Sequence, residues 1–155
     1  MNDSKPTAPA LAYVALVVDE PARTARVFTD VLGLPLLHAS TADNARIPIT
    51  PVGASALALF GRGEQAVDAT ASTGVNHIAL SAAEPAGAAN AWGFTRWTTR
   101  DGFAGAKEVV LPPELTAGVQ VRIARPLEMA PAAFSSPRDP LNAAKSPDQH
   151  SGSSQ

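Results

Sequence analysis

The stretch YVALVVDEPA at residues 13–22 recurs in outline as HIALSAAEPA at residues 77–86. Residue 13 corresponds to residue 77, an offset of 64, and the same offset relates Phe28 to Trp92. At the far end of each unit it also relates residues 57–59 to residues 121–123. A register that stays constant across a whole unit indicates an internal duplication, and therefore predicts two copies of one supersecondary unit.

Each copy has the pattern of a strand, a helix and three further strands. Residues 11–18 are apolar and partly β-branched, as expected of a buried strand. Asp19 is the predicted N-cap of the first helix, and Pro21 suits its first turn. Gly33 is suited to the left-handed conformation that ends a helix. One helical face would carry Ala25, Phe28, Val31 and Leu32.

The remaining strands are expected at residues 35–41, 45–50 and 55–60, then at 94–98, 107–111 and 118–124, with a shorter helix from Pro85 to Gly93. Residues 11–126 are thus one domain, made of modules 11–60 and 75–126 and a polar connector at 61–74. Residues 1–10 and 127–155 lack apolar periodicity, and we expect them to be disordered.

Composition excludes several classes of function. The chain of 155 residues has no cysteine, which excludes disulfides, a thiolate nucleophile and a cysteine-ligated metal. Its net charge of -2 provides no general attraction for nucleic acid or an anionic membrane, so neither is an expected partner. The apolar stretch at 8–18 is too short to span a bilayer and lacks the flanks of a signal peptide. A cytoplasmic protein is therefore expected.

The sequence resembles the vicinal oxygen chelate superfamily, which includes glyoxalase I, methylmalonyl-CoA epimerase, type I extradiol dioxygenases and bleomycin-resistance proteins. The residues that carry the resemblance are YVALVV at 13–18, VLGL at 31–34 and GVNHIAL at 74–80. The resemblance implies an α+β fold in which two βαβββ modules form an open, curved, mixed sheet around a cavity. The helices would cover the outer face, and the ligand would bind in the concave face.

The resemblance also implies four positions at which metal-using members hold a ligand, in the first and last strands of each unit. In this sequence they are Tyr13, Ala58, His77 and Arg122. Alanine donates no electron pair, arginine stays protonated, and tyrosine must ionise before it binds a metal. Only His77 is a usual ligand, whereas a metal centre needs three or more converging donors. No cofactor is therefore expected, and His77 would be a ligand only if a divalent metal were present.

Strand alternation places Tyr13 and His77 on the cavity face, with Ala58, Gln120 and Arg122 facing the same way. We therefore predict that these five residues bind the ligand. Arg122 and His77 would suit a carboxylate or phenolate, and Tyr13 would suit a flat molecule. Structural roles are the alternative for each residue, because a one-residue shift in register would turn Arg122 to solvent. No catalytic residue is identified.

Two main functions remain open. One is a metal-free protein, similar to glyoxalase and bleomycin-resistance proteins, that binds a small apolar or aromatic molecule, which could also be anionic. The alternative is a metal-dependent lyase, epimerase or dioxygenase of the same superfamily, so the sequence does not decide whether the protein is an enzyme. A third option is a degenerate second module that serves as an assembly partner, and the modules could pair within the chain or across a homodimer.

Overall fold

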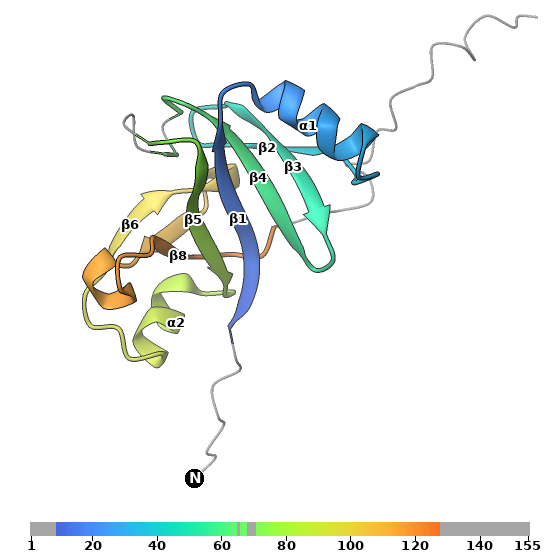
Figure 1. Ribbon diagram of the computed structural model, residues 1–155. Coiled ribbons are helices and arrows are strands. Elements are labelled where there is room, and N and C mark those ends of the chain that lie inside the picture. The colour runs from blue at the N-terminus through green and yellow to red at the C-terminus, as the bar shows by residue number, and fades with distance from the viewer. Residues whose placement is uncertain (1–8, 65, 68–70, 128–155) are drawn as a thin grey trace, which may run out of the picture.

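A computed structural model describes residues 9–64, 66–67 and 71–127 (Figure 1). The tails that the sequence predicts to be disordered lie almost entirely outside these residues. In chain order the elements are β1 (Ala10–Val18), α1 (Pro21–Asp30), β2 (Leu37–Ser40), β3 (Arg46–Val52), β4 (Ser55–Gly61), β5 (Gly74–Ser81), α2 (Pro85–Ala91), β6 (Thr98–Asp101), the 3₁₀ turn η1 (Phe103–Gly105), β7 (Lys107–Val110), the 3₁₀ turn η2 (Pro113–Thr116) and β8 (Val121–Ala124).

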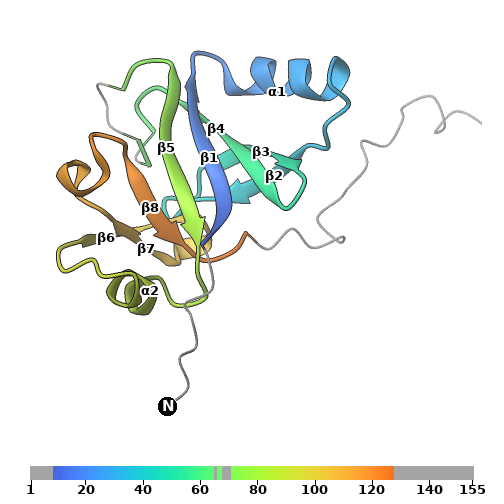
Figure 2. The same cartoon turned by 60° about the horizontal axis from the view of Figure 1, so that its bottom comes forward.

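The eight strands form one mixed sheet in the order β2-β3-β4-β1-β5-β8-β7-β6. The two modules meet at its centre, where β1 and β5 pair antiparallel. Figure 2 shows β1 and β5 side by side between the strands of the two modules. Helix α1 contacts β3 and β4, and helix α2 contacts β7 and β8, so each helix covers the two middle strands of its own module. The predicted α+β fold of two βαβββ modules in a curved sheet is confirmed.

The duplication is visible in the strand register. In the first module the parallel pair of β1 and β4 places Ala15 opposite Ala58. In the second module the parallel pair of β5 and β8 places Ala79 opposite Arg122. Both members of the second pair lie 64 residues after their counterparts, so the offset seen in the sequence is also the offset of the hydrogen-bonded ladders.

Two core clusters lie on opposite faces of the sheet. The concave face carries small and aromatic side chains from both modules, and the second cluster packs between α2 and the convex face of its module. The concave cluster includes Tyr13, Ala15, Val17, Ala56, Ala58, Phe60 and Ala79. The convex cluster includes Ala89, Val109, Leu111, Val121 and Ile123, with Ile78 and Leu80 packed against it. The predicted facing of these strands is therefore correct.

The first helix differs from its prediction at both ends. Glu20, and not Asp19, occupies the N-cap position, and it makes no side-chain capping bond. Asp19 instead pairs with Arg62 at 2.8 Å. The helix ends at Asp30, so Val31 and Leu32 lie beyond it and are 74% and 61% exposed rather than buried on a helical face.

The conformation of Gly33, which follows the helix, agrees with the prediction. Gly33 has φ +66°, in the left-handed region, and the Leu34 N–H donates to the Phe28 carbonyl across the turn.

Two predicted strands of the second module are also displaced. The strand expected at 94–98 lies at 98–101, because the Phe94 N–H donates to the Ala89 carbonyl and completes the turn after α2. Trp92, Phe94 and Trp97 pack against the convex cluster from this turn. The strand expected at 118–124 begins only at Val121, because η2 and the left-handed residues Ala117 and Gly118 precede it.

Candidate functional site

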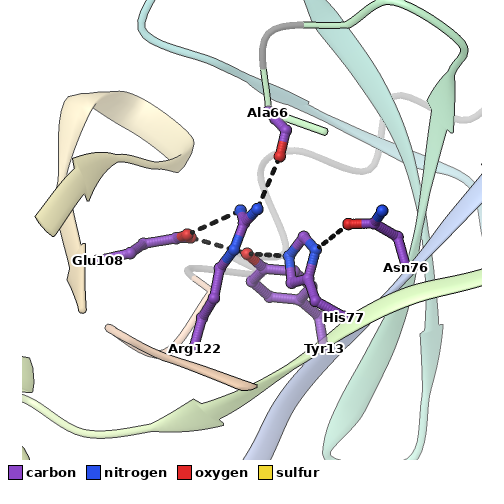
Figure 3. A network of polar contacts seen from close by, with 6 residues as sticks. All are labelled: Tyr13, Ala66, Asn76, His77, Glu108 and Arg122. Carbon is purple, nitrogen blue, oxygen red and sulfur yellow. Dashed lines mark hydrogen bonds and ion pairs between the residues drawn. The ribbon is translucent and has the colours of Figure 1, made fainter. Parts of the chain in front are cut away.

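The concave face contains a buried polar network that links both modules (Figure 3). The Tyr13 hydroxyl on β1 donates to Glu108 Oε1 on β7 at 2.8 Å. Arg122 on β8 donates through Nη1 to Glu108 Oε2 at 3.4 Å, and through Nη2 to the Ala66 carbonyl at 2.9 Å. All three side chains are buried, with residue exposures of 1% for Tyr13, 3% for Glu108 and 5% for Arg122. Removing one charge of such a pair would leave the other buried and uncompensated.

His77 on β5 extends the network on the other side of Tyr13. Its Nδ1 donates to Asn76 Oδ1 at 2.7 Å, and its Nε2 lies 3.3 Å from the Tyr13 hydroxyl oxygen. Burial, with the positive charges of Arg122 and Arg100 adding to it, lowers the pKa of His77 to about 2. His77 is therefore a neutral imidazole at physiological pH. With its Nδ1 proton donated to Asn76, His77 turns the lone pair of Nε2 toward the Tyr13 hydroxyl, whose own proton is donated to Glu108.

The Tyr13 hydroxyl stays protonated. Burial raises the pKa of Tyr13 well above its ordinary value of 10.0, and the negative charge of Glu108 raises it further. A phenol in this state donates a hydrogen bond but does not supply an anionic oxygen to a metal. Its proton is already directed at the Glu108 carboxylate.

Gly102 makes room for the Glu108 carboxylate. A Cβ at Gly102 would lie 2.4 Å from Glu108 Oε1 and 2.5 Å from Cγ and Cδ, closer than atoms can approach. The backbone at Gly102 is extended, with φ -108° and ψ -152°, so its glycine is not required by conformation. The position instead accommodates a side chain from the neighbouring strand.

Phe103 in η1 packs against the aromatic rings in and beside the network. Phe103 stacks on Phe60 with ring centroids 5.8 Å apart and meets Tyr13 edge-on at 5.3 Å. The η1 turn belongs to the second module but contacts β2 of the first. The connector also contributes, since Val67 is 4% exposed and packs into the concave cluster. The connector was predicted only as a polar linker, whereas part of it covers the concave face.

A cavity of about 410 Å³ remains between the modules, beside the network. Tyr13 and Glu108 form its buried polar wall, and His38, Ser40 and Arg125 are the exposed polar residues on its lining. The apolar lining includes Leu37, Ala39, Ile49, Phe103, Ala124 and Leu127. A volume of this size and a mainly apolar lining are typical of sites for small organic molecules.

The structure brings together three of the five residues predicted to bind a ligand. Tyr13, His77 and Arg122 belong to one network, and Arg122 faces inward as expected. Ala58 is fully buried in the concave cluster but does not line the cavity. Gln120 lies before β8 and is exposed, because that strand begins later than predicted. Of the five, only Tyr13 reaches the cavity of about 410 Å³.

Sequence reasoning missed Glu108 and Phe103. A signal for Glu108 was present, because Val109 and Leu111 belong to the convex cluster and alternation then turns Glu108 to the concave face. Phe103 lies in a turn, where no periodicity indicates a direction. His38 is exposed and lies at the cavity.

The donor set of this network does not fit a metal ion. No group of three or more histidine, cysteine, aspartate or glutamate side chains suited to a metal occurs among residues 9–64, 66–67 and 71–127. Glu108, the carboxylate nearest to His77 in the network, is already engaged by the Arg122 cation. A second arginine, Arg100, also acts electrostatically on His77. Two positive charges at this position would oppose a divalent cation.

Comparison with solved structures identifies the fold. Over 80% of this chain and 99% of the other, the structure matches a hypothetical protein from Bacillus halodurans C-125, with a TM-score of 0.65 and 17% sequence identity. It matches methylmalonyl-CoA epimerase from Mycobacterium tuberculosis over 76% of this chain and 87% of that one, with a TM-score of 0.62 and 19% identity. A Streptomyces coelicolor methylmalonyl-CoA epimerase in complex with 2-nitronate-propionyl-CoA matches over 75% and 96%, with a TM-score of 0.62 and 22% identity.

These likenesses establish the class of fold: the chain has the vicinal oxygen chelate fold, as the sequence resemblance implied. At this level of sequence identity, the likenesses show a shared fold and do not show a shared chemistry. No protein-family model and no curated protein matches the chain. Among the residues that the structure describes, none of the helices is long and apolar enough to cross a membrane.

Proposed function

We propose that the protein binds a small, largely apolar or aromatic organic molecule in the cavity between its two modules, without the help of a metal ion. The observation that carries the proposal is the cavity of about 410 Å³, whose wall is mainly apolar and draws on both modules. An apolar molecule would remove water from the half-buried Ala39, Phe103 and Leu127, and burial of apolar surface is the main source of affinity in such sites.

The polar wall of the cavity supports the same proposal. Tyr13 and Glu108 are already hydrogen-bonded to each other, and Glu108 is paired with Arg122. An apolar ligand would therefore leave no polar group of this wall newly unpaired. A buried polar group without a hydrogen-bond partner would otherwise cost about 1–3 kcal/mol. The network is therefore a hydrogen-bonded wall of the cavity and not a set of free metal ligands.

Binding of a neutral fluorescent probe, N-phenyl-1-naphthylamine, tests this function in buffer that contains a chelator. Ala39→Phe would fill part of the cavity, whereas Ala54→Phe adds the same side chain at an exposed turn outside it. We expect the wild-type protein and Ala54→Phe to bind the probe, and Ala39→Phe to bind it weakly. Equal binding by the three proteins, or no binding by any, would contradict a ligand site in this cavity.

Metal analysis separates this function from a metal-dependent lyase, epimerase or dioxygenase. Protein purified without chelators should contain no stoichiometric Mn, Fe, Co, Ni or Zn. One bound equivalent that is lost in His77→Ala would support the enzyme instead, because His77 is the one usual metal ligand at the four positions.

A further inference from the structure

The cavity has different polar groups at its buried wall and at its exposed residues. Tyr13 and Glu108 line it and are 1% and 3% exposed. Arg125 and His38 line it from exposed positions, after β8 and on β2 respectively. Apolar residues such as Ile49 and Leu37 line the same cavity. A ligand that fills the cavity would therefore meet one kind of polar group in the interior and another near solvent.

The buried end of the cavity, formed by Tyr13 and Glu108, accepts hydrogen bonds from a ligand and does not donate them. The single hydroxyl proton of Tyr13 is directed at Glu108 Oε1. Glu108 accepts from Tyr13 through one oxygen and from Arg122 through the other. A carboxylate offers about four lone-pair sites, so Glu108 has capacity for a further donor. Because Arg122 already balances its charge, a neutral hydroxyl or N–H group suits this end better than a cation, and an anion would be repelled.

The exposed end of the cavity, formed by His38 and Arg125, presents the Arg125 cation. The Arg125 guanidinium donates through Nε to the Ala83 carbonyl at 3.2 Å, and its Nη2 lies 3.4 Å from Glu84 Oε1. The Glu84 side chain is 82% exposed, and such surface pairs contribute little. A ligand carboxylate could therefore bind the same guanidinium, which has five N–H donors in a planar fork.

His38 does not oppose an anion at this end. Burial lowers the pKa of His38, and the neighbouring positive charge of Arg46 lowers it further, so the imidazole is neutral at physiological pH. The neighbouring charge of Arg46 is positive as well, so it does not oppose an anion either.

We propose that the cavity selects an elongated molecule with a neutral hydrogen-bond donor at Glu108, an apolar or aromatic middle, and an anionic group at Arg125. A hydroxyaryl alkanoate is the simplest chemical class with this arrangement. The proposal rests on the proposed function, since it specifies the orientation of a ligand in the same cavity.

Displacement of N-phenyl-1-naphthylamine by a set of matched probes tests the arrangement. The probes are 4-hydroxyphenyl acetate, propanoate and butanoate, each with a partner that lacks the ring hydroxyl and a partner in which the carboxylate is a methyl ester. For the homologue of best-fitting length, we expect loss of either group to weaken binding about tenfold, as for other hydrogen bonds to charged groups.

Variants assign each end to its residue. Arg125→Ala should remove the preference for the free carboxylate, whereas Arg62→Ala should keep it, because Arg62 is an equally exposed, ion-paired arginine that does not line the cavity. Glu108→Gln should reduce the preference for the hydroxyl, with folding checked by circular dichroism.

The outcomes separate this inference from the proposed function. If the naphthylamine probe binds but no homologue prefers the hydroxyl and carboxylate forms, the orientation is wrong and the apolar binding site stands. If Arg125→Ala and Arg62→Ala weaken carboxylate binding equally, the anionic end is not at Arg125. If neither the naphthylamine nor any alkanoate binds the wild-type protein, the proposed function fails.

Discussion

Replacing Gly102 with alanine tests whether close packing holds the Glu108 carboxylate in the polar network. The added Cβ would lie 2.4 Å from Oε1 and 2.5 Å from Cγ and Cδ of Glu108. Since the backbone at Gly102 is extended, alanine introduces no strain of its own there. The Glu108 side chain must therefore move, and its bonds to Tyr13 and Arg122 must lengthen or break.

The expected loss of stability follows from these contacts. A hydrogen bond to a charged group contributes about 1.5–3 kcal/mol, and Glu108 accepts one from the buried Tyr13 hydroxyl and one from Arg122. Alanine in place of glycine recovers about 0.4–1 kcal/mol by restricting the unfolded chain. If both bonds are lost, we expect Gly102→Ala to lower the free energy of unfolding by about 2–5 kcal/mol.

Urea unfolding followed by tryptophan fluorescence measures this loss, because Trp92 and Trp97 pack against the convex cluster. Gly87→Ala is the matched control: the nearest atom to its added Cβ is Glu84 Cβ at 3.7 Å, an ordinary contact within α2. It should stabilise the protein by about 0.5–1 kcal/mol.

A double variant tests the contact itself. Glu108→Asp shortens the side chain that the added Cβ would meet, so the effects of Gly102→Ala and Glu108→Asp on stability should be non-additive by about 1 kcal/mol.

Tyr13 supplies a second measurement, because it is the sole tyrosine of the chain and its ionisation is visible by ultraviolet absorbance. Burial raises the pKa of Tyr13, with the Glu108 charge as the next cause, so moving Glu108 away should lower that pKa. A Gly102→Ala protein that equals the wild type in both stability and tyrosine titration would refute the role given to Gly102.

Three further predictions concern the buried polar groups. Because the pKa of His77 is about 2 in the folded state against 6.5 in the unfolded state, its contribution is complete above about pH 6.5 and is lost as the pH falls. Relative to His77→Gln, the wild type should lose about 1.4 kcal/mol per pH unit below that point in urea unfolding, and parallel pH profiles would contradict the assignment. Thr50 Oγ1 is buried without a hydrogen-bond partner among the described residues, so Thr50→Val should raise thermal stability by about 1 kcal/mol; a less stable Val variant would reveal a partner. Arg122→Met should cost about 3 kcal/mol in urea unfolding because it leaves Glu108 buried without its cation, and adding Glu108→Leu should restore most of that loss. Equal stability of the single and double variants would show that the two charges are not coupled.

The internal duplication predicted the architecture because it can be recognised from the order of the residues alone. The offset of 64 is found by aligning the chain with itself, and the alternation of apolar residues depends on neighbours within one strand. Both reappear in the ladders that join Ala15 to Ala58 and Ala79 to Arg122. Alternation likewise turned Tyr13 and Arg122 to the concave face, where the structure also has them.

Element ends were less predictable because they depend on competition between turns and strands. Phe94 and Trp97 are aromatic and read as strand residues, yet they pack from a turn against α2. Gln120 follows a left-handed pair of residues and stays outside β8.

What the sequence by itself determined is therefore the repeated module, its fold class and the inward direction of Tyr13, Ala58 and Arg122. Only the tertiary structure decided which inward residues meet. The hydrogen bond between Tyr13 and Glu108 joins residues 95 positions apart, and the room for it comes from Gly102 in a turn. Alternation specifies a face but not a distance across the sheet. The curl of the sheet and the packing of η1 against β2 bring separate strands around one cavity.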